Sequence, residues 1–112
     1  MARIVMLNLN RDFRTMYHRG KSQVGSVLVT YVRKNRLDYC RAGITTGKKI
    51  GGAVRRNRCR RIIREAYRRL LPRINGGWDI VFVARQRTGD MKSTRITEVM
   101  EAQLIKLGVL KP

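Results

Sequence analysis

Residues 47–72 of the chain read GKKIGGAVRRNRCRRIIREAYRRLLP. Wound at about 100° per residue, residues 53–71 form a helix with two unlike sides, which Pro72 ends. One side collects the small and apolar side chains of Cys59, Ile62, Ile63, Ala66 and Leu70. The opposite side collects Asn57, Arg60, Arg61, Arg64 and Arg68. The periodicity predicts that the first side packs on a core and that the second meets solvent or a ligand.

The charges of this region favour a ligand. Residues 41–70 hold 11 of the 26 basic residues of the chain and one acidic residue, Glu65. Most charged helix faces are simply solvated, and these usually mix both signs, so that side chains four residues apart attract each other. Here like charges follow one another, at a cost of roughly a few tenths of a kcal/mol per pair. An anionic ligand therefore explains the arginines better than solvation does.

A glycine-and-lysine loop, residues 47–52, precedes the helix. Its glycines let backbone amides approach an anion closely, although the spacing is not that of a Walker loop. The planar guanidinium group of arginine can bind phosphate oxygens at two points. The loop and the helix together predict a surface for the phosphate backbone of a nucleic acid.

The whole chain has 112 residues, enough for one domain over residues 1–112, and a formal net charge of +19. Such an excess of charge favours a nucleic-acid partner. An anionic membrane surface would require a basic helix with a broad aromatic face or a lipid anchor motif, and neither is visible. Residues 1–9 are apolar but lack the cleavage pattern of a signal peptide, and we expect a cytoplasmic protein without a membrane span.

The residues that could carry catalysis or bind metal are few. Cys40, Cys59 and the single histidine, His18, cannot assemble a four-ligand zinc site or a disulfide framework. We interpret both cysteines as small buried hydrophobic residues and His18 as a surface residue. No carboxylate pair or activated nucleophile emerges from the spacing. The sequence therefore predicts no catalytic residue and no metal or cofactor bound by the protein alone.

The elements before the arginine helix are a helix and two strands. Asn10 or Asp12 is expected to cap a helix through about residue 17, which Gly20 ends. Alternation predicts a strand over residues 23–32 and another over residues 39–46, joined by a polar turn as a hairpin.

The elements after it are a strand and a helix. Residues 78–85 are apolar on both faces, which is typical of a central strand. A final amphipathic helix is expected to be capped by Ser93 or Thr94 and to stop at Gly108. The predicted order is α-β-β-α-β-α with a possible extra short strand, an α/β fold of the α+β two-layer type.

The sequence also resembles a known family. Residues 55–68, RRNRCRRIIREAYR, preceded by KKIG at 48–51, resemble the basic signature of the bacterial ribonuclease P protein subunit. Similar matches occur along the chain, at Asp12-Phe13 with Tyr17 and Gly20, and at residues 27–31, 41–44, 78–81 and 84–85.

The resemblance implies a mostly antiparallel or mixed sheet flanked by helices, with a left-handed βαβ crossover, although such connections are nearly always right-handed. It also implies that an RNA subunit hydrolyses the 5′ leader from precursor tRNA, with Mg²⁺ bound through the RNA. The protein would bind the catalytic RNA and the leader without supplying a catalytic side chain.

The family's sites can be transferred residue by residue. The residues implied to bind the catalytic RNA are Lys48, Lys49, Arg56, Asn57, Arg58, Arg60, Arg61, Arg64 and Arg68. Those implied to bind the leader are Phe13, Tyr17, Val27, Val29 and Tyr31. The spacing of Phe13, Met16 and Tyr17 alone favours residues that fill a core, and the resemblance is what favours the leader site.

Two features depart from the family pattern. Residues 1–10 are mostly apolar, whereas relatives usually begin with a longer basic stretch, and Gly47 and Gly52 stand where serine and asparagine are common. Two other functions remain open on the same residues: a small basic ribosomal or other structural RNA-binding protein, and a nuclease that acts without RNA.

Overall fold

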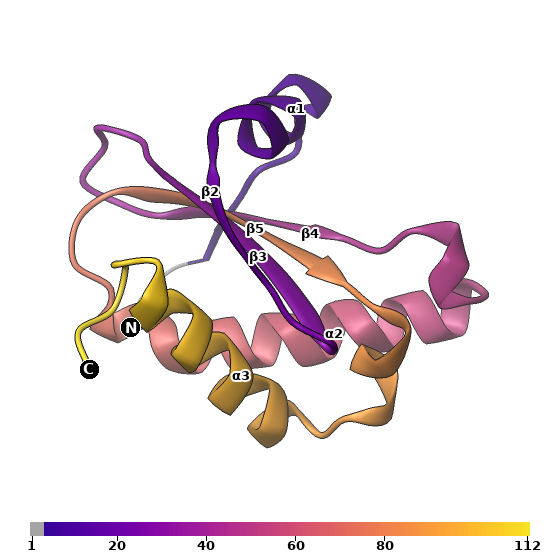
Figure 1. Cartoon of the computed structure of the whole chain (residues 1–112). Helices are drawn as coiled ribbons and strands as arrows, with labels where there is room; N and C mark the ends of the chain where they lie inside the picture. Colours follow the sequence, from indigo (N-terminus) through magenta and orange to yellow (C-terminus); the bar gives the residue numbers. More distant parts are fainter. Residues whose placement is uncertain (1–3) are drawn as a thin grey trace.

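The computed structural model describes residues 4–112, so residues 1–3 of the apolar N-terminal stretch lie outside the described residues. A five-stranded sheet of order β1-β4-β5-β3-β2 forms the middle layer (Figure 1). The strands are β1 (Val5–Met6), β2 (Lys21–Val24), β3 (Leu28–Lys34), β4 (Arg41–Thr45) and β5 (Trp78–Ala84). Strand β4 pairs in parallel with β1 and β5, and β3 pairs antiparallel with β5 and β2. The sheet is therefore mixed, as predicted.

Helices cover both faces of this sheet. Helix α1 (Asn10–Arg19) lies on one face, and α2 (Ala53–Leu70) and α3 (Ser93–Lys106) lie on the other (Figure 1). Short 3-10 turns η1 (Lys48–Ile50), η2 (Leu71–Arg73) and η3 (Gln86–Asp90) join the larger elements. The β4-α2-β5 connection is the parallel crossover that the resemblance implied. The left-handedness of this crossover stays a prediction.

Two strand predictions were wrong. The region over residues 23–32 contains two strands, because the backbone N–H of Gly25 donates to the carbonyl of Leu28 and turns the chain between β2 and β3. The region over residues 39–46 does not form a hairpin with it, because β5 lies between β3 and β4. Strand β1, which no alternation predicted, adds at the far edge. Both β3 and β5 are largely buried, so the two most apolar strands pair at the centre.

Both faces of β5 are apolar, as predicted, and they divide the apolar residues into two clusters. The larger cluster fills the space between the sheet and helices α2 and α3, and there Ile80 and Phe82 of β5 are fully buried. The smaller lies under α1 and contains Leu7, Met16 and Val81. Burial of one such side chain stabilises the fold by about 1.5–3 kcal/mol. Because β5 places residues in both clusters, it stabilises the packing on both faces of the sheet.

The helix boundaries agree with the sequence, but the expected caps do not. Helix α2 ends at Leu70, directly before η2 and Pro72. Helices α1 and α3 each begin without a side-chain hydrogen bond at the cap, so neither pair of expected capping residues caps its helix. The expected cap residues Asn10 and Ser93 are instead the first residues within the helices.

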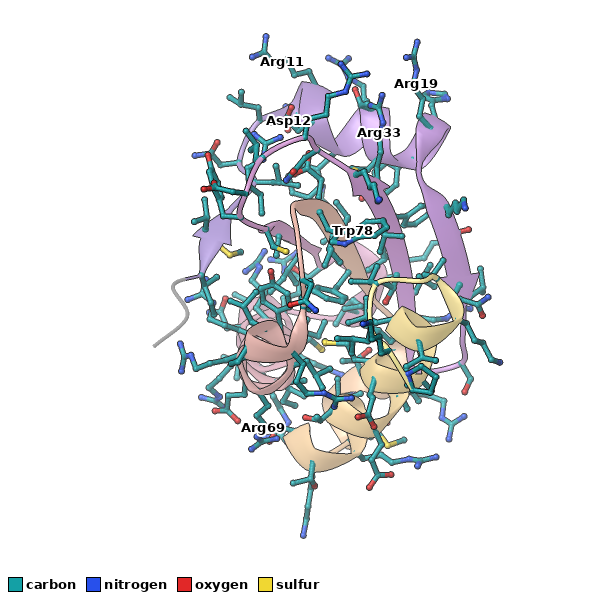
Figure 2. All side chains as sticks on the ribbon, turned by 90° about the vertical axis from the view of Figure 1, so that its left-hand side faces the viewer. Arg11, Asp12, Arg19, Arg33, Arg69 and Trp78 are labelled. Carbon is teal, nitrogen blue, oxygen red and sulfur yellow. The ribbon has the colours of Figure 1, made fainter. Side chains whose placement is uncertain are left out.

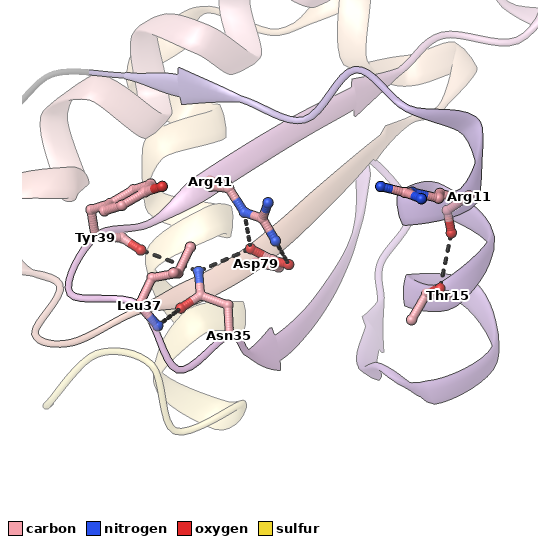
Figure 3. Close-up of polar contacts among 7 residues, drawn as sticks. All are labelled: Arg11, Thr15, Asn35, Leu37, Tyr39, Arg41 and Asp79. Carbon is pink, nitrogen blue, oxygen red and sulfur yellow. Dashed lines mark hydrogen bonds and ion pairs between the residues drawn. The ribbon is translucent and has the colours of Figure 1, made fainter.

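A polar network closes the turn after β3 (Figure 3). Arg41 donates to both carboxylate oxygens of Asp79, at 2.9 and 2.7 Å, and this ion pair raises the pKa of Arg41. The amide of Asn35 donates to Asp79 and to the carbonyl of Tyr39, while its oxygen accepts from the backbone N–H of Leu37. The side chain of Asn35 therefore ties the turn to its own backbone, at Leu37 and Tyr39, and to Asp79 of the neighbouring strand β5.

Gly77 packs against this turn without room for a side chain. A Cβ atom there would lie 2.0 Å from the carbonyl oxygen of Leu37 and 2.2 Å from Oδ1 of Asn35. We predict that Gly77→Ala lowers the free energy of unfolding by about 1–3 kcal/mol, because overpacking must displace backbone. Urea denaturation measures this loss.

Gly47→Ala is the matched control, because a Cβ atom at Gly47 meets nothing within 4 Å and its φ of −73° suits any residue. The control should unfold at the same urea concentration as the original chain. Equal stability of the two variants would show that the turn around Asn35 is not fixed as described.

Candidate nucleic-acid interface

Helix α2 presents a continuous polar side to solvent. Buried Cys59, Ile62, Ile63 and Ala66 hold the opposite side against the sheet and α3, as the sequence predicted. The exposed residues of the polar side, called here the arginine row, are Asn57, Arg60, Arg61, Arg64 and Arg68. Because their helix is anchored by its apolar side, the guanidinium groups are presented on a rigid support.

Among the described residues, the arginine row has no acidic partners. Among residues 4–112, the ion pairs are Arg41–Asp79, Arg55–Asp90, Arg73–Glu101 and Arg95–Glu98, and none includes a member of the row. The side-chain contact recorded within the row runs from Nη1 of Arg60 to Oδ1 of Asn57, at 3.0 Å. The row is thus a surface of one sign, open to phosphate oxygens.

The lysines of the loop lie next to the row. Lys48 and Lys49 are exposed in η1, and buried Ile50 anchors this turn in the core. Gly51, with a φ of 135°, adopts a conformation that favours glycine and leads the chain from η1 toward α2. The N–H groups that begin α2 lack a side-chain cap, and helix N-termini attract anions.

Other arginines of α2 serve the fold. Arg55 donates to the carbonyl of Gln86 at 2.8 Å and pairs with Asp90 at 2.9 Å. Nε of Arg58 donates to the carbonyl of Gly89 at 2.8 Å, and Arg69 donates to Thr97 of α3. These contacts hold η3 and α3 beside α2.

The residues predicted to bind the catalytic RNA therefore differ in how free their side chains are. Arg58 is exposed but gives one donor to η3, and Arg56 is half-buried beside the row. The remaining members of the set, Lys48, Lys49 and the arginine row, are exposed to solvent. Helical spacing already separates Arg58 from the arginine row. The structure adds that the Arg58 side chain is bound to the carbonyl of Gly89.

A second candidate surface lies where α1 crosses β3 and β4. The rings of Tyr17 and Tyr31 meet edge to face, with centroids 5.1 Å apart. The hydroxyl groups of Tyr17 and Thr45 are 2.8 Å apart and share a hydrogen bond. Tyr17 is 40% exposed and Tyr31 is half-buried, so both rings keep part of their surface open.

The apolar residues predicted beside these tyrosines have different positions. Phe13 is half-buried over Gly43, where a Cβ atom would lie 2.6 Å from the ring. Met16 is buried, so the core interpretation holds for this residue. Val29 is buried and lines a neighbouring hollow. Val27 belongs to the main core cluster, so the structure does not bring it together with Phe13, Tyr17 and Tyr31. The α1 surface is defined below as Phe13, Tyr17, Val29 and Tyr31.

Sequence reasoning missed a hollow between the two surfaces. Val29 and Val83 line it together with three cationic residues, Lys49, Arg85 and Arg87. Nε2 of Gln86 donates to the carbonyl of Lys49, which ties η3 to the glycine-and-lysine loop. The pattern Arg85-x-Arg87 after a central strand could have indicated it. The hollow makes the positive surface continuous from η1 to the α1 surface.

The remaining reactive side chains are dispersed. Within the described part of the chain, no three His, Cys, Asp or Glu side chains gather where they could hold one metal ion. Cys40 and Cys59 are buried and unpaired, and burial raises the pKa of both thiols. His18 is exposed at the end of α1. None of the helices in residues 4–112 is long and apolar enough to cross a membrane.

Comparisons with known proteins agree with this arrangement. The family model for ribonuclease P matches residues 1–108. The chain is 48% identical over 85 residues to the ribonuclease P protein component of Clostridioides difficile, covering 75% of each, and 40% identical over 101 residues to that of Clostridium botulinum, covering 89% of this chain and 91% of the other.

Solved structures show the same fold. The RNase P protein of Staphylococcus aureus superposes with a TM-score of 0.84 at 33% identity, over 97% of this chain and all of the other. That of Thermotoga maritima gives 0.77 at 34% identity, over 88% and 94%. With the sequence matches and the shared architecture, the chain belongs to the ribonuclease P protein component family.

Proposed function

We propose that this chain binds the catalytic RNA of ribonuclease P through the arginine row, Lys48 and Lys49, and the 5′ leader of precursor tRNA through the α1 surface. In this role it assists the removal of the leader that produces the mature tRNA 5′ end. The observation that carries the proposal is the exposed row on α2, which has no carboxylate partner among residues 4–112.

The chemistry of the row suits a folded polynucleotide. Each guanidinium group can donate two parallel hydrogen bonds to phosphate oxygens. The helix holds successive groups three or four residues apart, so several phosphates can be bound at once by a support that does not reorganise. The lysines of η1 add point charges at the start of the helix.

The α1 surface suits an unpaired strand. Aromatic faces stack on any base, so a site built on Tyr17 and Tyr31 accepts leaders of different sequence. Lys49, Arg85 and Arg87 around the adjoining hollow would hold the phosphates of the same strand.

Hydrolysis belongs to the RNA in this proposal. Mg²⁺ is expected to bind through the RNA, because four of the seven acidic residues of the chain are engaged with arginines. The protein then contributes binding and orientation, without a catalytic side chain, in the cytoplasm. The purified protein alone should leave precursor tRNA uncleaved, and cleavage without RNA would instead identify a nuclease.

The arginine row can be tested through salt dependence. We expect Arg61→Ala with Arg64→Ala to weaken assembly with the cognate catalytic RNA. The slope of log affinity against log salt should become shallower by roughly 0.7–0.9 per lost phosphate contact. Filter binding over a range of monovalent salt measures both quantities.

The matched control removes two positive charges from α3, by Arg95→Ala with Lys106→Ala, at positions that are exposed and distant from the row in sequence. Its slope should remain close to that of the original chain. If the two double variants lose the same slope, net charge accounts for binding and the row has no specific role.

The α1 surface can be tested through leader preference. The reconstituted holoenzyme is compared at low magnesium on precursors with and without a 5′ leader. We expect Tyr17→Ala with Tyr31→Ala to remove most of the preference for the leader, because stacking contributes about 1–3 kcal/mol per base. Tyr39→Ala removes an exposed tyrosine from another surface and should keep the preference. An unchanged preference in the double variant would exclude this surface as the leader site.

A further inference from the structure

The only tryptophan of the chain, Trp78, lies away from both surfaces described above. It begins β5, is half-buried, and packs in part against the main core cluster on the α2 and α3 side of the sheet. Tyr31 of the α1 surface packs on the other side. Figure 2 shows Trp78 beside the C-terminal turn, well apart from Arg11 and Arg19 of the α1 region. A strand bound on the α1 surface therefore meets a different face of the molecule.

Trp78 forms part of the wall of a positively charged hollow. The hollow's basic lining residues are Lys34, Arg36, Arg73 and Lys111, and no acidic residue lines it. Leu37, the Asn75-Gly76-Gly77 segment and the turn from Gly108 to Lys111 complete the wall. The hollow thus combines an aromatic ring with several cations.

One cation already sits over the ring. Nζ of Lys34 lies 5.6 Å from the centroid of the Trp78 ring, and Lys34 is itself exposed on the last position of β3. An exposed cation–π contact of this kind is weaker than the stacking of a base on an aromatic ring. A base can therefore displace the ammonium group, which remains close enough to meet a neighbouring phosphate.

The turn that carries Arg36 is rigidly built. Arg36 has a φ of 62°, a conformation that non-glycine residues adopt uncommonly. The side chain of Asn35 holds this turn by bonds to Leu37, Tyr39 and Asp79. The backbone of Arg36 is therefore held at the rim of the hollow before any ligand binds.

We propose that this hollow is a second binding site for single-stranded nucleic acid. One unpaired base stacks against Trp78, and its flanking phosphates contact Lys34, Arg36 and Lys111. Arg73 contributes less, because it is paired with Glu101. Since η2 contains Arg73 and directly follows α2, the site lies at the C-terminal end of the helix that carries the arginine row.

The combination favours nucleic acid over an acidic peptide. Carboxylates would need only the cations, whereas a nucleotide uses the cations and the flat indole surface together. An acidic peptide is the alternative ligand that the test must separate from nucleic acid.

Because Trp78 is the single tryptophan, all indole emission of the chain comes from this hollow. The full chain is titrated with a short oligouridylate while indole emission is recorded. We expect saturable quenching, retained in Tyr17→Ala with Tyr31→Ala. In Lys34→Ala with Arg36→Ala, half-saturation should shift to higher concentration and the salt dependence should become shallower by about 0.7 per lost phosphate contact.

Two further ligands separate the sources of binding. An abasic oligomer of the same length carries the phosphates without bases and should quench little, and a poly-glutamate peptide should do the same. Equal quenching by the abasic oligomer would overturn base stacking, and equal quenching by poly-glutamate would assign the hollow to acidic peptides. Absence of quenching where a labelled oligouridylate binds the chain would place all binding elsewhere. The titration uses neither catalytic RNA nor precursor tRNA, so its failure leaves the proposed processing role standing.

Discussion

The structure depends on one helix that must satisfy opposite demands on its two sides. The apolar side of α2 is buried against the sheet and α3, and this burial orders 18 residues that carry a dense positive charge. Repulsion along the arginine row opposes the helix, and packing of Ile62, Ile63 and Ala66 offsets it. The charged surface therefore exists only because the core holds it, and the backbone positions of its arginines are fixed before a polyanion arrives.

The central strand β5 transmits the same constraint to the second surface. Its residues pack alternately under α1 and under α2, so both candidate RNA surfaces rest on one strand. The strand pairs with β3, which carries Tyr31, and with β4, which leads through η1 to α2. A displacement of β5 would move the tyrosines and the arginine row together.

Features that depend on local periodicity could be predicted from the sequence, and features that depend on pairing could not. The buried side of α2 follows from a 3.6-residue period, and the two faces of β5 follow from alternation. The hairpin prediction failed because alternation does not identify the neighbour of a strand, and the insertion of β5 between β3 and β4 is decided by burial. At the site, spacing found the arginine row, but Val27 could not be separated from Val29, since the turn at Gly25 shifts its position into the main core.

The scarcity of acidic residues determines which cations fold the chain and which remain available. Asp79 and Asp90 pair with Arg41 and Arg55, and Glu98 and Glu101 pair with Arg95 and Arg73. These acids lie on β5, η3 and α3. Three of the four pairs join different elements of the fold, the pair Arg95–Glu98 lies within α3, and among the described residues none includes a member of the arginine row. Because buried or partly buried charges need partners while exposed ones do not, a chain with 26 basic residues needs few acidic ones for its fold, and four of its seven acids form the ion pairs found among residues 4–112. The excess of 19 charges is thereby left on the outer surfaces, where a polynucleotide can neutralise it.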